Sequence, residues 1–219
     1  MTTYREGCGR EGEVPRGITR DRVSSVRIAV AIFEGAEELD WAGPWEVFAA
    51  WAEQWPEDGV EVFTVAEREE PIRCAKGLRV LADYTWEAAP QIDVLVYPGG
   101  RGTRPQLGVE PNRRRLRELA AGGTLMTSVC TGSLVYADAG LLDGRPATTH
   151  WGEIELLETL GNGIDVRREA RFVDDGQIVT AAGVSAGIDM ALHLVGRLHS
   201  PERARDVRRY IQYDPEPPF

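Results

Sequence analysis

Cys130 is the residue of this sequence best placed for covalent chemistry. It follows a predicted strand, Thr124 to Val129, and precedes Thr131-Gly132-Ser133, where a helix is predicted to begin. A strand that turns sharply into a helix exposes one side chain at the carboxyl edge of a sheet, beside unpaired N–H groups. Those groups and the helix dipole favour a thiolate, the reactive form of cysteine. The pattern predicts a nucleophile; the alternative is a core cysteine, since unpaired cysteines are often buried.

A thiolate that attacks an unsaturated carbon also needs a proton carrier and donors for the developing charge. Asp40 is the candidate carrier, because it lies in the loop after the first predicted strand, at the same sheet edge as Cys130. A helix-capping acid is an equally good interpretation. The N–H groups of Gly99 and Gly100 end another predicted strand and either approach a substrate or form a tight turn. Thr131 either contacts a ligand or caps its helix.

Two further side chains are candidates for the same edge of the sheet. His150, in the segment ATTHW at the end of a predicted strand, either pairs with Cys130 as a base or is structural. Trp41 either lines an apolar substrate pocket or belongs to the core. The sequence has no Walker, HExxH or EF-hand pattern, and its three cysteines, Cys8, Cys74 and Cys130, show no C-x-x-C spacing. We therefore expect no metal and no cofactor.

These candidates lie among short apolar runs that alternate with amphipathic segments. The run VRIAVAIF, from Val26, is typical of a strand covered on both faces of a parallel sheet. After it, Trp41, Trp45, Phe48 and Trp55 recur at helical spacing. The same reasoning predicts strands at 26–33, 60–66, 93–97, 124–129, 147–150, 170–173 and 177–181, an extended excursion at 72–81, and helices at 42–55, 111–121 and 131–139, with others ending near 160 and 198 and one beginning near 201.

Strands alternating with helices predict an α/β fold with a doubly wound, mostly parallel sheet and helices on both faces. Ligands in such folds bind beyond the carboxyl ends of the strands. Residues 26–219 contain no repeat or linker and are expected to form a single domain. Residues 1–25 carry five arginines among Gly, Ser and acidic residues, with few apolar side chains, so we expect a flexible tail there.

Composition restricts the classes of partner. There are 25 Lys and Arg against 35 Asp and Glu, and the net charge of -10 repels nucleic acids and anionic lipids. No run reaches the roughly 18 apolar residues of a membrane span, and the first residues lack the apolar core of a signal peptide. We expect a cytoplasmic protein that acts on a small-molecule substrate, with no nucleic-acid or membrane partner.

Five segments together resemble the ThiJ/PfpI superfamily, which has the class I glutamine amidotransferase-like fold. They are LDWAGPWEVF, VYPGG, TSVCTGSLVYADAGLLDGRPATTHW, GVSAGIDMALHLV and YDPEPPF, and the resemblance covers about Val26 to Phe219. It implies a flavodoxin-like sandwich, a homodimer, and Cys130 as the nucleophile on a strained turn. The isocyanide hydratases of this superfamily carry an aspartate after the first strand, where Asp40 lies, and a threonine after the cysteine, which matches Thr131.

The resemblance implies a cysteine-dependent hydro-lyase that converts an organic isocyanide to an N-substituted formamide through a thioimidate on Cys130. A glyoxalase-like or deglycase-like enzyme of the same fold is one alternative. Another is a non-catalytic ligand-sensing or regulatory module, because the TSVCTGSL and ATTHW segments are shared with AraC-type regulators. A redox-sensing role of Cys130 is a third. PfpI-type proteases have a histidine beside their cysteine, so peptidase activity is not expected.

Overall fold

A seven-stranded sheet forms the centre of the computed structural model, which describes residues 25–216. The strand order is β10-β11-β7-β6-β1-β2-β5. The strands are β1 (Val26–Ala31), β2 (Val60–Ala66), β5 (Tyr84–Thr85), β6 (Val94–Tyr97), β7 (Leu125–Val129), β10 (Phe172–Asp174) and β11 (Ile178–Ala181). All neighbours pair in parallel except β10 with β11. The predicted doubly wound, mostly parallel sheet is confirmed, while the predicted tail at 1–25 lies, apart from Ser25, outside the described residues.

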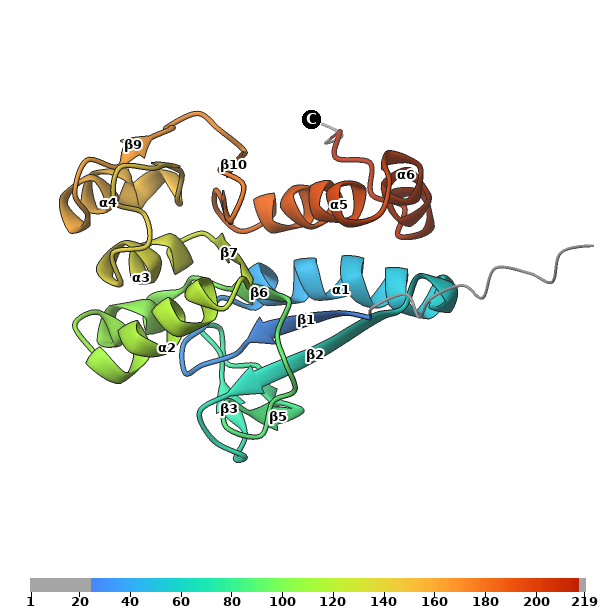
Figure 1. The fold of residues 1–219 in the computed structure, drawn as a ribbon, viewed down its shortest axis with the longest axis horizontal. Helices are drawn as coiled ribbons and strands as arrows, with labels where there is room; N and C mark the ends of the chain where they lie inside the picture. The colour runs from blue at the N-terminus through green and yellow to red at the C-terminus, as the bar shows by residue number, and fades with distance from the viewer. Residues whose placement is uncertain (1–24, 217–219) are drawn as a thin grey trace, which may run out of the picture.

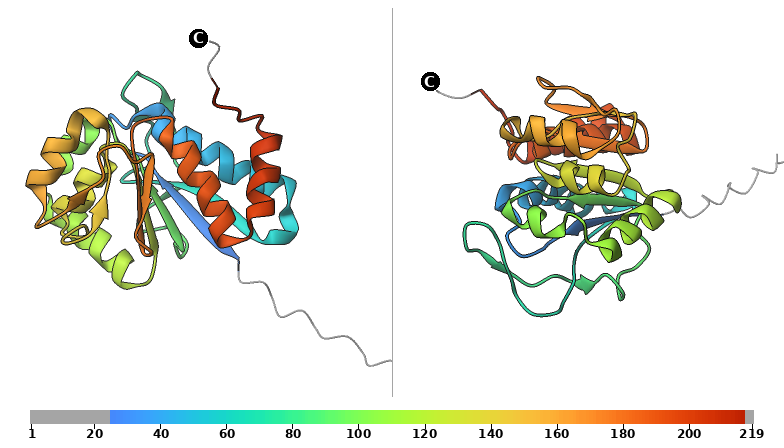
Figure 2. Two further views of the ribbon diagram at one scale, coloured as in Figure 1. Left: turned by 90° about the horizontal axis from the view of Figure 1, so that it is seen from above. Right: turned by 90° about the vertical axis from the view of Figure 1, so that its left-hand side faces the viewer.

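Helices cover both faces of the sheet, as the left view of Figure 2 shows. On one face lie α1 (Glu38–Gln54), α5 (Ala186–Leu198) and α6 (Pro201–Tyr210), and Figure 1 shows α5 running along α1. On the other face lie α2 (Glu110–Ala121), α3 (Gly132–Asp138) and α4 (Ile154–Leu160). Among residues 25–216, no helix combines the length and the apolar character that a membrane crossing needs.

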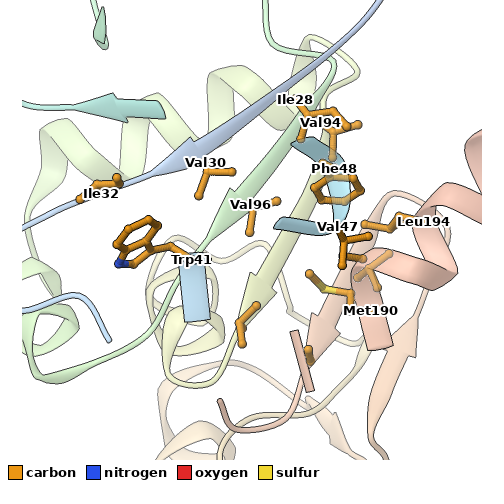
Figure 3. Packing of buried hydrophobic residues seen from close by; sticks show 14 of the residues in the cluster. Ile28, Val30, Ile32, Trp41, Val47, Phe48, Val94, Val96, Met190 and Leu194 are labelled. Atoms are coloured by element: carbon orange, nitrogen blue, oxygen red, sulfur yellow. The ribbon is translucent and has the colours of Figure 1, made fainter. Parts of the chain in front are cut away.

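Strand β1 explains why the central runs are apolar throughout. Successive side chains of a strand point to opposite faces, so Ile28 and Val30 enter the core beneath α1 while Ala29 and Ala31 enter the core beneath α2 and α3. Figure 3 shows the first core, in which side chains of α1 and α5 meet those of β1 and β6. Both faces of β1 are thus buried, which fixes its position in the middle of the sheet.

Two predicted segments differ from the structure in extent. The excursion at 72–81 is a hairpin of β3 (Ile72–Arg73) and β4 (Arg79–Val80) that turns at Gly77. The strand predicted at 147–150 is reduced to β8 (Pro146–Ala147), which pairs with β9 (Asp165–Val166) outside the main sheet. His150 therefore lies in a loop, before η3 (Trp151–Glu153), and does not end a strand of the main sheet.

The chain changes direction across the sheet between β1 and β6. From β1 the chain continues to β2 on one side, and from β6 it continues to β7 on the other. The loop after β1 leads to α1, and the loop after β6 leads through η2 (Arg101–Gln106) to α2 on the opposite face. Such a switch point opens a crevice at the carboxyl ends of the strands. Ligand sites are therefore expected where β1, β6 and β7 end.

Candidate active site

Cys130 lies on a strained turn between β7 and α3. Its φ is 56°, a left-handed conformation that side chains other than glycine seldom adopt. The Cys130 N–H donates to the carbonyls of Ala181 and Ala182, at 3.1 and 3.0 Å, so the end of β11 holds the turn in place. The residue is only 6% exposed, yet it lines a cavity at this edge of the sheet.

The residues after the cysteine fix this turn from the other side. A Cβ on Gly132 would lie 2.3 Å from the carbonyl oxygen of Tyr97, so only glycine lets α3 begin this close to β6. The hydroxyls of Ser133 and Thr149 both donate to the Cys130 carbonyl, at 3.1 and 2.9 Å. The strand-to-helix turn predicted from the sequence is therefore held by three neighbouring segments of the chain.

Asp40 lies beside this thiol. Because α1 begins at Glu38, Asp40 belongs to the first turn of the helix, whereas from the sequence we expected it in the preceding loop. It is fully buried, and its Oδ2 accepts the Gly99 N–H at 2.9 Å. Oδ1 is buried without a regular hydrogen bond from any described residue, and the Cys130 thiol is the reactive group next to this carboxyl. The structure thus brings together the two residues singled out as nucleophile and proton carrier.

Burial alters the protonation of both groups. It raises the pKa of Asp40 to about 7, although the Gly99 N–H and the thiol oppose this rise. Burial, together with the charge of Asp40, raises the pKa of Cys130 to about 12, against the N–H groups of Thr131 and Val184. From the sequence we expected the helix start to favour a thiolate, but the raised pKa of Cys130 favours the protonated thiol in the resting protein. The resting sulfur is a neutral thiol, and the carboxyl changes protonation near neutral pH.

The two glycines after β6 position other site residues. A Cβ on Gly99 would lie 2.4 Å from the Thr131 nitrogen, so this position needs glycine. The Gly99 N–H donates to Asp40 and is therefore not free to contact a substrate, contrary to one of our two interpretations. Gly100 lines the cavity, and its N–H donates to Thr131 Oγ1 at 2.9 Å. The Thr103 hydroxyl donates to the same oxygen at 3.2 Å. These contacts fix Thr131 and the carboxyl together.

The cavity above Cys130 has a volume of about 340 Å³. At its wall, Arg104 and Glu153 form an ion pair of 2.5 Å, and Glu37 pairs with Lys76. The two carboxylates at the cavity, Glu37 and Glu153, are therefore each paired with a cation. Within the described part of the chain, no cluster of three or more His, Cys, Asp or Glu side chains is arranged to hold a metal ion.

Of the two remaining candidates, His150 lines the cavity at Cys130 and Trp41 does not. His150 lines the cavity, but its Nδ1 accepts the Gly152 N–H at 3.2 Å and no hydrogen bond joins its ring to Cys130. Trp41 is 8% exposed, lies in the core near Ile32 in Figure 3, and is absent from the cavity wall. The core interpretation of Trp41 is therefore the one that the structure supports.

Three residues of the site carried no sequence signal that we recognised. Val184 has a φ of 47°, which a β-branched residue rarely adopts, and its N–H is directed at the Cys130 sulfur. Thr103 and Arg104 lie in η2 and are joined by a hydrogen bond of 3.0 Å. The glycine-rich segment PGGRGTRP marked a turn here, but the contacts of its side chains depend on how η2 folds over α3.

The thiol, the carboxyl and the strained turn lie at the carboxyl edge of a sheet whose sequence pattern is shared with known proteins. Residues 26–197 match the DJ-1/PfpI family. The chain belongs to this family. It is 38% identical over 195 residues to an isonitrile hydratase of Pseudomonas putida, which covers 89% of this chain and 82% of that protein.

Other members of the DJ-1/PfpI family extend the comparison. The crystal structure of a ThiJ/PfpI family protein from Pseudomonas syringae superposes with a TM-score of 0.80 at 30% identity, covering 94% of this chain and 85% of that one. The transcriptional regulator CdhR of Pseudomonas aeruginosa is 36% identical over 138 residues, which span 63% of this chain and 40% of the regulator. The fold is thus shared by a hydratase and by part of a regulator.

Proposed function

We propose that this protein hydrates an organic isocyanide to an N-substituted formamide, with Cys130 as the nucleophile and Asp40 as the proton carrier. The observation that carries the proposal is a buried carboxyl, with a pKa near 7, beside a thiol that lines a small cavity. Isonitrile is another word for isocyanide, so the relative from Pseudomonas putida supports the substrate class.

In the first step, ionised Asp40 accepts the Cys130 thiol proton while the sulfur attacks the terminal carbon of R–NC. Asp40 then delivers that proton to the same carbon. A C–S and a C–H bond form, and the product is the thioimidate R–N=CH–S–Cys130 with no change in net charge. A carboxyl whose pKa lies near the working pH suits both transfers, because it accepts and returns a proton at little cost.

In the second step, water adds to the thioimidate carbon while Asp40 accepts a proton from it and passes that proton to the nitrogen. The adduct is R–NH–CH(OH)–S–Cys130. Its hydroxyl proton then moves through Asp40 to the departing sulfur as the C–S bond breaks. The products are R–NH–CHO and the free thiol, so the balance is one isocyanide plus one water.

The backbone around the sulfur supports this sequence of steps. The N–H groups of Thr131 and Val184 are directed at the sulfur. They would stabilise the negative charge that develops on it as it loses its proton and again as the C–S bond breaks. Gly99 keeps one oxygen of Asp40 engaged, which leaves Oδ1 available for the proton.

A turnover assay with two substrates tests the proposal. The protein should convert cyclohexyl isocyanide to N-cyclohexylformamide, followed by the appearance of the formamide, and should leave methylglyoxal unchanged. Turnover of methylglyoxal alone would instead favour a glyoxalase-like or deglycase-like enzyme of the same fold. Tight binding of a small molecule without turnover of either compound would favour a sensing module, such as the regulators that share this domain.

A further inference from the structure

We propose that a second cavity, of about 520 Å³, binds a neutral, largely apolar molecule that carries one hydrogen-bond donor. The cavity lies where β1, β2 and β6 end and is lined there by Phe33, Arg68 and Tyr97. It therefore occupies the crevice of the switch point between β1 and β6, where α/β folds bind ligands. Its volume is in the range of small-molecule sites.

The second cavity is separate from the one at Cys130. The two share no lining residue, and η2 lies between them. Gly102 and Gln106 of η2 line the second cavity, whereas Arg101 and Arg104 of the same segment line the cavity at Cys130. A ligand in one cavity therefore does not need to displace a ligand from the other.

Aromatic and aliphatic side chains form most of its wall. The rings of Phe33 and Tyr97 stack with centroids 5.4 Å apart, and Ile72 closes the side beneath the β3–β4 hairpin. Trp86 contributes an indole that the Arg115 guanidinium covers at 4.9 Å. Flat aromatic surfaces of this kind favour a planar or ring-shaped apolar molecule.

One polar group in this wall has an unused acceptor. The Tyr97 hydroxyl donates to Gln106 Oε1, and Asn112 Nδ2 donates to the same oxygen at 3.3 Å. Gln106 Nε2 donates to the Gly102 carbonyl at 2.9 Å. Within residues 25–216, no donor reaches Asn112 Oδ1, although Asn112 is only 8% exposed. Because Asn112 lines the cavity and its Oδ1 is an accessible acceptor, this oxygen favours a ligand with an N–H or O–H group.

The charges around the cavity cancel in pairs. Glu34 pairs with Arg68, and Glu67 pairs with Arg115. Neither an anion nor a cation would find an unpaired charge among these four side chains, and an ion would have to leave water to enter an apolar cavity. The charge balance therefore points to a neutral ligand.

Indole and 1-methylindole are matched probes for this site, since only indole carries the N–H donor. Titration calorimetry with the full chain should show indole binding, and 1-methylindole binding about tenfold more weakly. Asn112→Leu should bind the two compounds equally. Val109→Trp changes a residue at the rim that is 41% exposed, fills the cavity from outside, and should abolish binding of both compounds without lowering the melting temperature.

Cys130→Ala serves as the control for the other cavity and should bind indole as the wild type does. Loss of indole binding in Cys130→Ala would place the probe at the active site and overturn the proposal. Equal binding of indole and 1-methylindole to the wild type, unchanged binding in Val109→Trp, or no binding at all would also overturn it. None of these results depends on whether the protein hydrates isocyanides.

Discussion

Two carboxyls of this protein, Asp40 and Asp58, have opposite surroundings. Asp58, at the end of η1 (Pro56–Asp58), accepts Trp51 Nε1 at 2.7 Å and the Arg203 guanidinium at 2.6 and 3.1 Å, and His199 lies 3.2 Å away. Burial alone would raise the pKa of Asp58, but these hydrogen bonds and charges hold it below its usual value. Asp58 thus ties α1 and η1 to α6 as a fully partnered anion.

Asp40 lacks that compensation. Among residues 25–216, its only regular hydrogen bond comes from the Gly99 N–H and no cation reaches it, and burial raises its pKa to about 7. An aspartate therefore stabilises the fold where its partners are complete, and we propose that it carries a proton where they are incomplete. Carboxyls with a strongly raised pKa cluster at functional sites, and this one lies beside a thiol at a cavity, which is why we assign the chemistry to Asp40.

The contrast between Asp40 and Asp58 has the functional meaning that we give it only if catalysis needs the thiol beside Asp40. Cys130→Ala should lower kcat/KM for cyclohexyl isocyanide by at least about a thousandfold, because the covalent step is lost. Cys74→Ala is the matched control, since Cys74 is also buried but lies outside the cavity at Cys130. Similar activities of the two variants in a steady-state assay would contradict the assignment.

Asn substitutions separate the two carboxyls by activity. Asp40→Asn should lower kcat/KM by about 10²- to 10⁴-fold, the usual contribution of a positioned acid or base. Wild-type kcat/KM should rise with pH through the Asp40 pKa, about 7, because the ionised carboxyl accepts the thiol proton, and this rise should be absent from Asp40→Asn. Asp58→Asn should retain near wild-type kcat/KM and the same pH profile at temperatures where it is folded.

The two Asn substitutions should affect stability in the reverse order, with Asp58→Asn the destabilising one. Asp58→Asn should lower the free energy of unfolding by about 1.5 to 3 kcal/mol at pH 7, because it weakens hydrogen bonds to a charged group. Since the folded pKa of Asp58 is depressed, its contribution is present above the unfolded value of 3.8 and is lost as the pH falls through the folded pKa. Urea denaturation at pH 7 and below pH 4 measures this, and a pH-independent difference would argue against the ion-pair explanation.

The last predicted effect is that of Asp40→Asn on stability, and its sign is opposite to that of Asp58→Asn. The folded pKa of Asp40 is raised, so its ionised form costs stability above about pH 7, and the cost is relieved as the pH falls toward 3.8. Asp40→Asn should therefore unfold at a higher temperature than the wild type at pH 8. The gain should disappear at pH 4. A variant less stable than the wild type at pH 8 would make Asp40 a structural acid like Asp58.

Most of the fold followed from the sequence because local pattern and tertiary burial agree there. The run from Val26 is apolar on both faces, and β1 is indeed buried on both faces in the middle of the sheet. The prediction was wrong where local pattern decides little. The segment at 147–150 reads as a strand, but only Ala147 of it lies in one, β8, which pairs with β9. It does not join the main sheet beside β11, because β11 already pairs with β7 and β10.

The site was less accessible to sequence reasoning. The turn at Cys130 and its neighbour Asp40 follow from the rule that parallel strands end at one edge. The protonation of the pair does not, because the high pKa of Cys130 comes from burial and from the Asp40 charge, which no local sequence encodes. Val184 could not be predicted either, since β-branched residues disfavour the left-handed conformation that it adopts.

Intact-mass spectrometry with peptide mapping tests the central claim most directly. The protein is mixed with cyclohexyl isocyanide and quenched during turnover, with Asp40→Asn alongside as a variant expected to form the thioimidate more slowly than the wild type. We expect a mass increase of one isocyanide, located on the peptide that contains Cys130 and absent from Cys130→Ala. Formamide production by Cys130→Ala at the wild-type rate, with no adduct on any cysteine, would contradict the account.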